Sequence, residues 1–148
     1  MRDTQRQVVA VTGASGGVGR AVAHAFARRG ARVGLLARGE PGLQAAAREV
    51  QELGGEALVL PTDVADADAV EAAATRVEER FGPLDVWVND AMATIFAPFT
   101  EVSAEEYARA TQVTYLGTVH GTMAALRDRK STRLNSSHLT QSRMPSSA

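Results

Sequence analysis

A short apolar run that leads straight into a glycine-rich turn constrains this chain more than any other feature. Residues 8–19 read Val-Val-Ala-Val-Thr-Gly-Ala-Ser-Gly-Gly-Val-Gly. Four apolar residues before a turn are typical of a buried parallel strand, and the apolar spacing that follows predicts a helix. A strand, a glycine turn and a helix in this order predict a phosphate-binding site, because backbone N–H groups at the helix start point at the ligand.

The glycines of this turn have separate predicted roles. Gly13 permits the tight turn, Gly17 lets a pyrophosphate approach the backbone, and Gly19 lets the helix pack closely on the strand. With Thr12 they form the pattern Thr-Gly-x-x-x-Gly-x-Gly, a relative of the G-x-G-x-x-G fingerprint. The alternative is a glycine-rich turn that binds no ligand. Motifs elsewhere in the chain are needed to choose between the two interpretations.

The composition excludes several classes of function. The chain has 148 residues, 45% of them hydrophobic, and a net charge of −1, which describes one globular domain with no sign of nucleic-acid binding. It has no cysteine, which excludes disulfides and cysteine-ligated metal and fits a reducing compartment. No apolar run approaches the roughly 20 residues that span a bilayer. We therefore expect a soluble, cytoplasmic protein without a metal or a membrane partner.

The last residues differ in composition from the rest. Residues 1–127 hold 12 arginines, no lysine and two serines, whereas residues 128–148 hold the only lysine and six serines. Residues 128–138 and 142–148 resemble the translation of a sequencing adapter, with a variable index between the two constant parts. A natural Ser/Arg-rich disordered tail is the alternative. We expect a half-domain over 1–127 and a non-native, disordered tail over 128–148.

Predicted strands and helices alternate along the chain. Strands are expected at 8–11, 32–37, 57–60 and 85–89. The first helix shows its apolar spacing over 18–26 and stops at Gly30, and further helices are expected at 41–53, 66–80 and 103–126. Asp66 and Ser103 are the expected N-caps of the last two helices, and Ser103 forms a capping box with Glu106. This alternation predicts the α/β class with a Rossmann-type, doubly wound parallel sheet. Its strand order would be 3-2-1-4, with the later strands missing.

Three motifs follow the predicted strands at their carboxyl ends, where open α/β sheets bind ligands. They are Thr12-Gly13-x-x-x-Gly17-x-Gly19, Asp63-Val64 and Asn89-x-Ala91. With them, the chain resembles the N-terminal half of a short-chain dehydrogenase/reductase (SDR) over about residues 7–127. The resemblance implies that the Asp-Val pair receives the adenine and that the Asn-x-Ala segment stabilises the sheet and lines the cofactor. It implies this cofactor-binding set: Thr12, Gly13, Ser15, Gly17, Val18, Gly19, Arg38, Asp63, Val64, Asn89 and Ala91.

The residue after the second strand bears on the choice of cofactor. NAD-binding proteins usually carry an acidic group near Ala37, whereas this chain has Arg38, whose guanidinium suits a 2′-phosphate. NADP is therefore the expected cofactor, with NAD as a possible substitute. Ser15 either contacts the same phosphate or only stabilises the turn. The alternative for Arg38 is an arginine on the surface without a ligand. The alternative for Asp63 is a solvated carboxylate in a turn.

Two positions depart from the family pattern. Asn89-Asp90-Ala91-Met92 replaces Asn-Asn-Ala-Gly, so a side chain occupies a place usually kept bare beside the nicotinamide ribose. Thr114 stands where the family has an asparagine that helps to hold a proton-relay water. A hydroxyl lacks the paired donor and acceptor of an amide. We therefore expect the relay to differ or to be absent.

The family's catalytic serine and Tyr-x-x-x-Lys are not found in this sequence. Tyr107 is followed four residues later by Thr111, and Tyr115 by Val119, so both tyrosines are expected to pack or cap the last helix. The histidines show no metal spacing, and Trp87 is expected in the core.

The resemblance implies an NAD(P)-dependent oxidoreductase that transfers hydride between NADP(H) and an alcohol or carbonyl substrate, of which this chain is an inactive fragment. The alternative is a non-catalytic dinucleotide-binding module that acts as a sensor or partner protein. Coding DNA past Arg127 distinguishes them: Ser and Tyr-x-x-x-Lys in frame favour the enzyme, and a native stop codon favours the module. The parent is expected to be a homo-oligomer through its last helix. Because nothing covers that helix here, we expect a poorly soluble or loosely folded chain.

Overall fold

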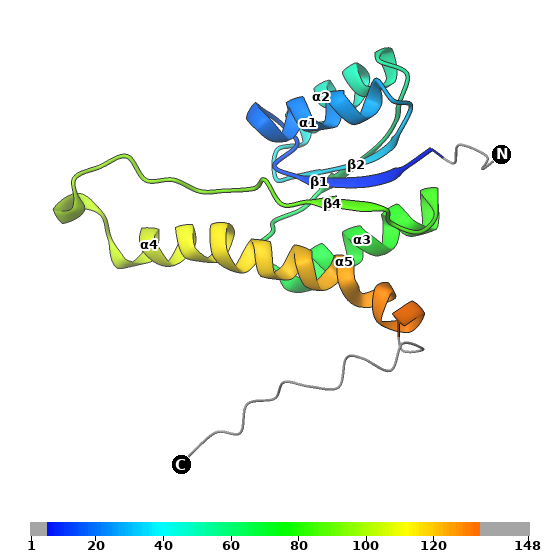
Figure 1. Ribbon diagram of the computed structural model, residues 1–148. Helices are drawn as coiled ribbons and strands as arrows, with labels where there is room; N and C mark the ends of the chain where they lie inside the picture. Colours follow the sequence, from blue (N-terminus) through cyan, green and yellow to red (C-terminus); the bar gives the residue numbers. More distant parts are fainter. Residues whose placement is uncertain (1–5, 134–148) are drawn as a thin grey trace.

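The computed structural model describes residues 6–133, which form a sheet with helices on both faces (Figure 1). Helices α1 and α2 lie on one face, and α3 lies with α5 on the other. The strands are β1 (Val8–Thr12), β2 (Arg32–Ala37), β3 (Glu56–Pro61) and β4 (Val86–Val88). The helices are α1 (Gly17–Ala27), α2 (Glu40–Glu52), α3 (Ala67–Phe81), α4 (Ala104–Thr111) and α5 (Gly117–Arg133). A 3₁₀ turn spans Phe99–Glu101.

The sheet is parallel throughout, in the order β3-β2-β1-β4. Val9 in β1 lies beside Val33 in β2 and, on its other side, beside Val86 in β4. This order confirms the predicted 3-2-1-4 arrangement. It brings the segments that follow the four strands to one edge of the sheet, because parallel strands all end on the same side.

Alternating side chains of the strands build a core on each face. Val9, Val11 and Leu35 pack with Leu43 and other residues of α1 and α2 on one face. On the other face, β-strand side chains such as Leu36 pack against α3. Every residue of β1 is buried, as expected for a strand covered on both faces.

The predicted helix caps are present. Asp66 accepts a hydrogen bond from the backbone N–H of Ala69 at the start of α3. Ser103 and Glu106 form the reciprocal capping box that opens α4: each side chain accepts a hydrogen bond from the other residue's backbone N–H. Both caps satisfy N–H groups that have no partner within the helix.

The last predicted helix differs from expectation in two ways. A π-helical turn over Gln112–Leu116 joins α4 to α5, where a regular helix was predicted. Helix α5 continues to Arg133, so the tail that we expected to be disordered from Asp128 begins inside a helix. Residues 134–148 lie outside the described part of the chain. Within residues 6–133, no helix has the length and hydropathy needed to cross a membrane.

The last helix was expected to be uncovered, and this is confirmed for Leu116 and Leu126 but is wrong for Val113. Leu116 and Leu126 are 37% and 44% exposed, whereas Val113 is 8% exposed because it packs against Val64 and Val70. Trp87, which we expected in the core, is only half-buried. Its strand β4 is the edge of the described sheet.

Candidate functional site

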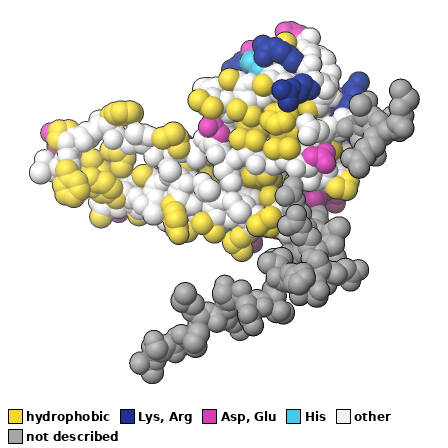
Figure 2. Space-filling model, in the orientation of Figure 1, with side chains coloured by type: hydrophobic (Ala, Val, Ile, Leu, Met, Phe, Trp, Pro, Cys, Tyr) yellow, Lys and Arg dark blue, Asp and Glu magenta, His cyan; other side chains and the backbone are white. Residues whose placement is uncertain are grey.

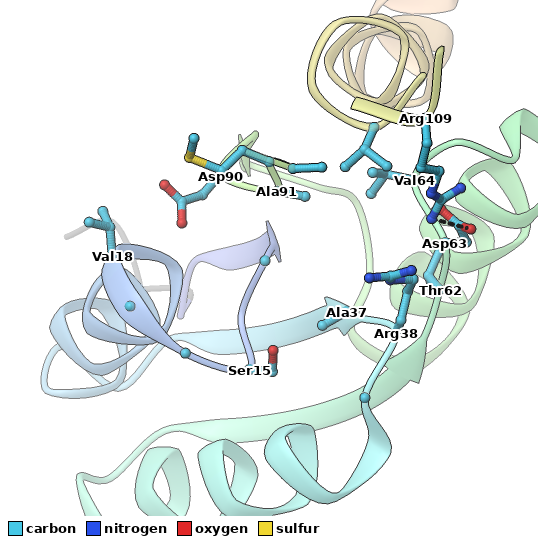
Figure 3. Close-up of a pocket in the computed structure, with 17 residues that line it drawn as sticks. Ser15, Val18, Ala37, Arg38, Thr62, Asp63, Val64, Asp90, Ala91 and Arg109 are labelled. Carbon is cyan, nitrogen blue, oxygen red and sulfur yellow. Dashed lines mark hydrogen bonds and ion pairs between the residues drawn. The ribbon is translucent and has the colours of Figure 1, made fainter. Parts of the chain in front are cut away.

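A pocket of about 570 Å³ opens at the carboxyl ends of the strands (Figure 3). Its walls come from the turn after β1, the ends of β2 and β3, the segment after β4, and α4 with the π-helical turn. This is the place where open parallel sheets bind ligands, because the loops there diverge to opposite faces.

Most residues predicted to bind a cofactor line this pocket. They are Gly13, Ser15, Gly17, Val18, Arg38, Asp63, Val64 and Ala91. Thr12, Gly19 and Asn89 do not line it, although each lies next to a residue that does. The sheet order therefore collects one group of side chains from segments far apart in the sequence.

The glycine turn has the shape that a phosphate cradle requires. Gly17, the first residue of α1, has a φ of 53°, and a Cβ atom added there would meet no atom within 4 Å. The space beside its backbone is thus open to the pocket. Because Gly17 has no side chain, a ligand can come close to the backbone at the start of α1.

Gly19 has the packing role that we predicted. A Cβ atom on Gly19 would collide with the backbone carbonyl of Gly13 and approach the Asp90 carboxylate. The missing side chain lets α1 lie directly against the turn that precedes it. Gly19 therefore shapes the pocket from behind, without lining it.

Thr12 and Asn89 act on the pocket through other residues. The buried Thr12 hydroxyl accepts hydrogen bonds from the N–H groups of Asp90, at 3.0 Å, and Ala91, at 3.1 Å. The Asn89 side chain accepts a hydrogen bond from Trp87 and donates one to Thr122, which ties β4 to α5. Both residues fix the segment after β4, so their contribution is to position the pocket wall.

Asp63 is held by both of its carboxylate oxygens. Oδ1 accepts a hydrogen bond from the N–H of Ala65 at 3.0 Å, and Oδ2 pairs with Nη2 of Arg109 at 2.8 Å. Partial burial raises the pKa of Asp63, but these two hydrogen bonds and the charges of Arg109 and Arg38 outweigh it and leave the pKa below its usual value. Asp63 is therefore an ionised carboxylate with a fixed orientation at neutral pH.

Arg109 is a pocket residue that the sequence did not reveal. It projects from α4 toward Asp63, and Arg38 approaches the same place from the end of β2 (Figure 3). No local motif marks Arg109, because its partner lies 46 residues earlier in the chain. Only the packing of α4 against the segment after β3 brings the two together.

The comparisons with known proteins agree with this geometry. Residues 7–134 match the sequence model of the short-chain dehydrogenases. The chain belongs to this family. It is 33% identical over 127 residues to the uncharacterised oxidoreductase YxnA of Bacillus subtilis, covering 86% of this chain and 36% of that protein. It is 34% identical over 131 residues to 3-dehydrosphinganine reductase of Danio rerio, covering 85% of this chain and 40% of that protein.

Solved structures of short-chain dehydrogenases share the fold. An alcohol dehydrogenase of Thermococcus sibiricus, complexed with 5-hydroxy-NADP, superposes with a TM-score of 0.79 at 38% identity, covering 86% of this chain and 55% of that one. L-sorbose reductase of Gluconobacter frateurii, complexed with NADPH and L-sorbose, superposes with a TM-score of 0.77 at 28% identity. The match covers 86% of this chain and 49% of that one. The chain thus spans about a third of the curated relatives' length and about half of these structures.

Asp90 and Met92, the departures from the short-chain dehydrogenase pattern, both line the pocket. The Asp90 side chain points toward the start of α1, near Val18 (Figure 3). A carboxylate there interacts favourably with the positive end of the helix dipole and would compete with an anionic ligand. The Met92 side chain is 67% exposed, so it is free to move when a ligand enters.

Thr114 uses its hydroxyl to hold the segment after β4. Its Oγ1 accepts a hydrogen bond from the N–H of Ala93 at 3.0 Å and lies 3.2 Å from the Ala93 carbonyl, to which it donates. Ala93 itself lines the pocket. In this structure the residue at the family's asparagine position therefore has a positioning role.

The remaining chemically notable side chains have other partners. His24 pairs with Glu49, and His120 contacts the Val64 carbonyl at 2.8 Å. Across residues 6–133, no cluster of three or more potential ligands suits a metal ion. Tyr107 packs on Phe99, but Tyr115 is 66% exposed, so its predicted packing role is wrong.

Proposed function

We propose that this chain is the nucleotide-binding part of an NADP-dependent oxidoreductase that transfers hydride between NADP(H) and an alcohol or carbonyl substrate. One observation carries the proposal: the pocket joins the open glycine turn at the start of α1 to a guanidinium at the end of β2. The similar structures from T. sibiricus and G. frateurii, which hold 5-hydroxy-NADP and NADPH, support it.

The residues present suit each part of the cofactor. The N–H groups beside Gly17 would hold the pyrophosphate, because a phosphate meets no side chain there. Arg38 would pair with the 2′-phosphate, and Asp63 with Val64 would form the adenine site. The segment from Ala91 to Ala93 would lie along the nicotinamide ribose. The nicotinamide supplies or accepts the hydride when bound.

We further propose that this chain alone does not turn over substrate. Proton transfer to or from a carbonyl oxygen needs a positioned acid or base, and no tyrosine in this sequence is followed four residues later by a lysine. The test is NADPH oxidation with a panel of aldehydes and ketones. Steady turnover by this chain would show that a tyrosine followed four residues later by a lysine is not required for proton transfer, and would overturn this proposal.

The cofactor assignment is tested by Arg38→Asp. Replacing the guanidinium by a carboxylate turns a charge-assisted phosphate contact into repulsion, so we expect NADPH affinity to fall by roughly a hundredfold and NADH affinity to change little. Fluorescence titration or calorimetry with both nucleotides measures the two dissociation constants. Equal weakening of both would show that Arg38 does not recognise the 2′-phosphate.

Gly17→Val complements Arg38→Asp by testing the opposite end of the pocket, where the pyrophosphate would bind. Its side chain fills the approach to the pyrophosphate, which NADPH and NADH share, so both should lose binding. The helical circular dichroism signal should stay close to that of the wild type. Unchanged affinity for either nucleotide would remove the glycine turn from the proposed site.

A further inference from the structure

Three charged side chains from separate elements meet at one end of the pocket. Arg38 follows β2, Asp63 follows β3, and Arg109 projects from α4 (Figure 3). Arg109 is bonded to the Asp63 carboxylate at 2.8 Å, and the charge of Arg38 also acts on that carboxylate. Arg38 has no hydrogen bond among the described residues, so its guanidinium is available to a ligand.

The ion pair between Arg109 and Asp63 determines how much uncompensated negative charge lies near Arg38. With Arg109 in place, the Asp63 carboxylate is largely neutralised by a partner on the far side from β2. Without Arg109, an ionised carboxylate would stand uncompensated beside Arg38. It would attract that guanidinium and repel a dianionic phosphate arriving there, because charges interact more strongly in a partly desolvated pocket than in water.

We propose that Arg109 is a specificity-determining residue, which favours NADP(H) over NAD(H) by neutralising Asp63 and so leaving Arg38 free for the 2′-phosphate. The inference rests on the proposed function. It adds to that function a residue that acts through another side chain and does not itself contact the phosphate. Arg109 is therefore a positioning residue in the cofactor site.

The test is Arg109→Met, which removes the charge and keeps most of the side-chain length. We expect the ratio of NADPH to NADH affinity to fall by about tenfold, since any change at the adenine site acts on both nucleotides and cancels in the ratio. Adenosine 2′,5′-bisphosphate and adenosine 5′-monophosphate should show the same difference, since they carry only the adenosine end. Arg109→Lys should restore much of the ratio. The matched control is Arg76→Met, an exposed arginine on α3 outside the pocket lining, which should leave the ratio unchanged.

A second test, made in the Asp63→Asn variant, distinguishes neutralisation of Asp63 by Arg109 from direct contact between Arg109 and the phosphate. In Asp63→Asn the carboxylate charge is gone, so adding Arg109→Met should no longer change the ratio. A fall of the same size in that background would show that Arg109 touches the phosphate itself and would overturn the inference. An unchanged ratio for Arg109→Met alone, with wild type still preferring NADPH, would also overturn it. If the wild type binds neither nucleotide, the proposed function itself fails.

Discussion

The helices on the two sides of the sheet differ in how much apolar surface they leave exposed. On the face covered by α1 and α2, large side chains such as Leu35, Leu43 and Val50 are completely buried. On the face covered by α3 and α5, Met123 and Tyr115 are 65% and 66% exposed. Figure 2 shows hydrophobic side chains gathered along α5 and at the end of the molecule formed by α4 and the loop before it. Leu36 in the sheet and Val77 on α3 are also completely buried, so the difference lies on the outer surface of α5 and of the segment before it.

The less covered face follows from the position of β4. This three-residue strand is paired only with β1 in the described sheet, and its residues are all half-buried. Helix α5 passes close to it: a Cβ atom on Gly121 would collide with Asn89 and Trp87. On the outer side of α5, Met123 and Leu126 are exposed among the residues that the structure describes, and a hollow of about 560 Å³ opens beside Val119 and Met123.

The candidate site lies where these two regions meet. The glycine turn and Arg38 belong to the closed face, whereas Asp90 and Arg109 belong to the segments on the open face. A ligand that contacts both walls would link them and stabilise the less covered one by mass action. Cofactor binding is therefore expected to protect α4 and the segment after β4 more than β1 or β2.

The largest expected contrast is between two leucines. Leu35→Ala removes a side chain that is 0% exposed in β2, so it should lower the free energy of unfolding by about 2–5 kcal/mol. Leu126→Ala removes one that is 44% exposed on α5, and the change should stay within about 0.5 kcal/mol. Urea unfolding, checked by amide hydrogen exchange of β2 and α5, measures both. Similar losses would mean that the two faces are equally well packed.

A smaller effect is expected from charging the open face. We propose that α5 forms a homo-oligomer interface, and the exposed Met123 and Leu126 support that proposal. In this chain the same surface should bind a hydrophobic dye and promote self-association. Met123→Glu should reduce both by several-fold, as measured by dye fluorescence and sedimentation velocity. Val18→Glu, an equally exposed apolar residue on α1, is the control and should change self-association little.

The sequence predicted the closed face more accurately than the open one. Strand β1 and the turn after it were predictable because a continuous apolar run ending in glycines has few structural solutions. Trp87 and Val113 were assigned wrongly for opposite reasons. Alternation within β4 does not reveal that the strand is an edge, and helical spacing alone does not reveal that Val113 faces the segment after β3.

The candidate site shows the same division. Gly17 ends the glycine turn that follows β1, and Arg38 follows β2 directly, so the place of both at the pocket could be inferred from local sequence. Arg109 could not, because its role depends on how α4 packs against Asp63. The π-helical turn was also missed, since no residue type in Gln112–Leu116 marks such a change of hydrogen bonding.

The smallest expected effect concerns pH and the closed face alone. Glu49 on α2 accepts a hydrogen bond from Arg20 on α1 at 2.8 Å and pairs with His24 at 2.6 Å. The Arg20 hydrogen bond, with lesser help from His24, lowers the pKa of Glu49 to about 2 from an ordinary 4.5. A carboxyl group with a lowered pKa stabilises the folded state above the unfolded pKa, and this contribution disappears as the pH falls from 4.5 toward 2.

Glu49→Gln should therefore melt slightly below the wild type at pH 7, and the gap should narrow as the pH is lowered to 3. The gap is small because the Glu49 side chain is 38% exposed and solvent screens the pair. Melting curves at both pH values, with Glu52→Gln on the same helix as the control, measure it. A gap that is constant with pH would mean that Glu49 acts through packing and not through its charge. The contact between helices α1 and α2 would then depend on their buried apolar side chains and not on this ion pair. Such buried apolar side chains are what most clearly distinguishes this face from the exposed side of α5.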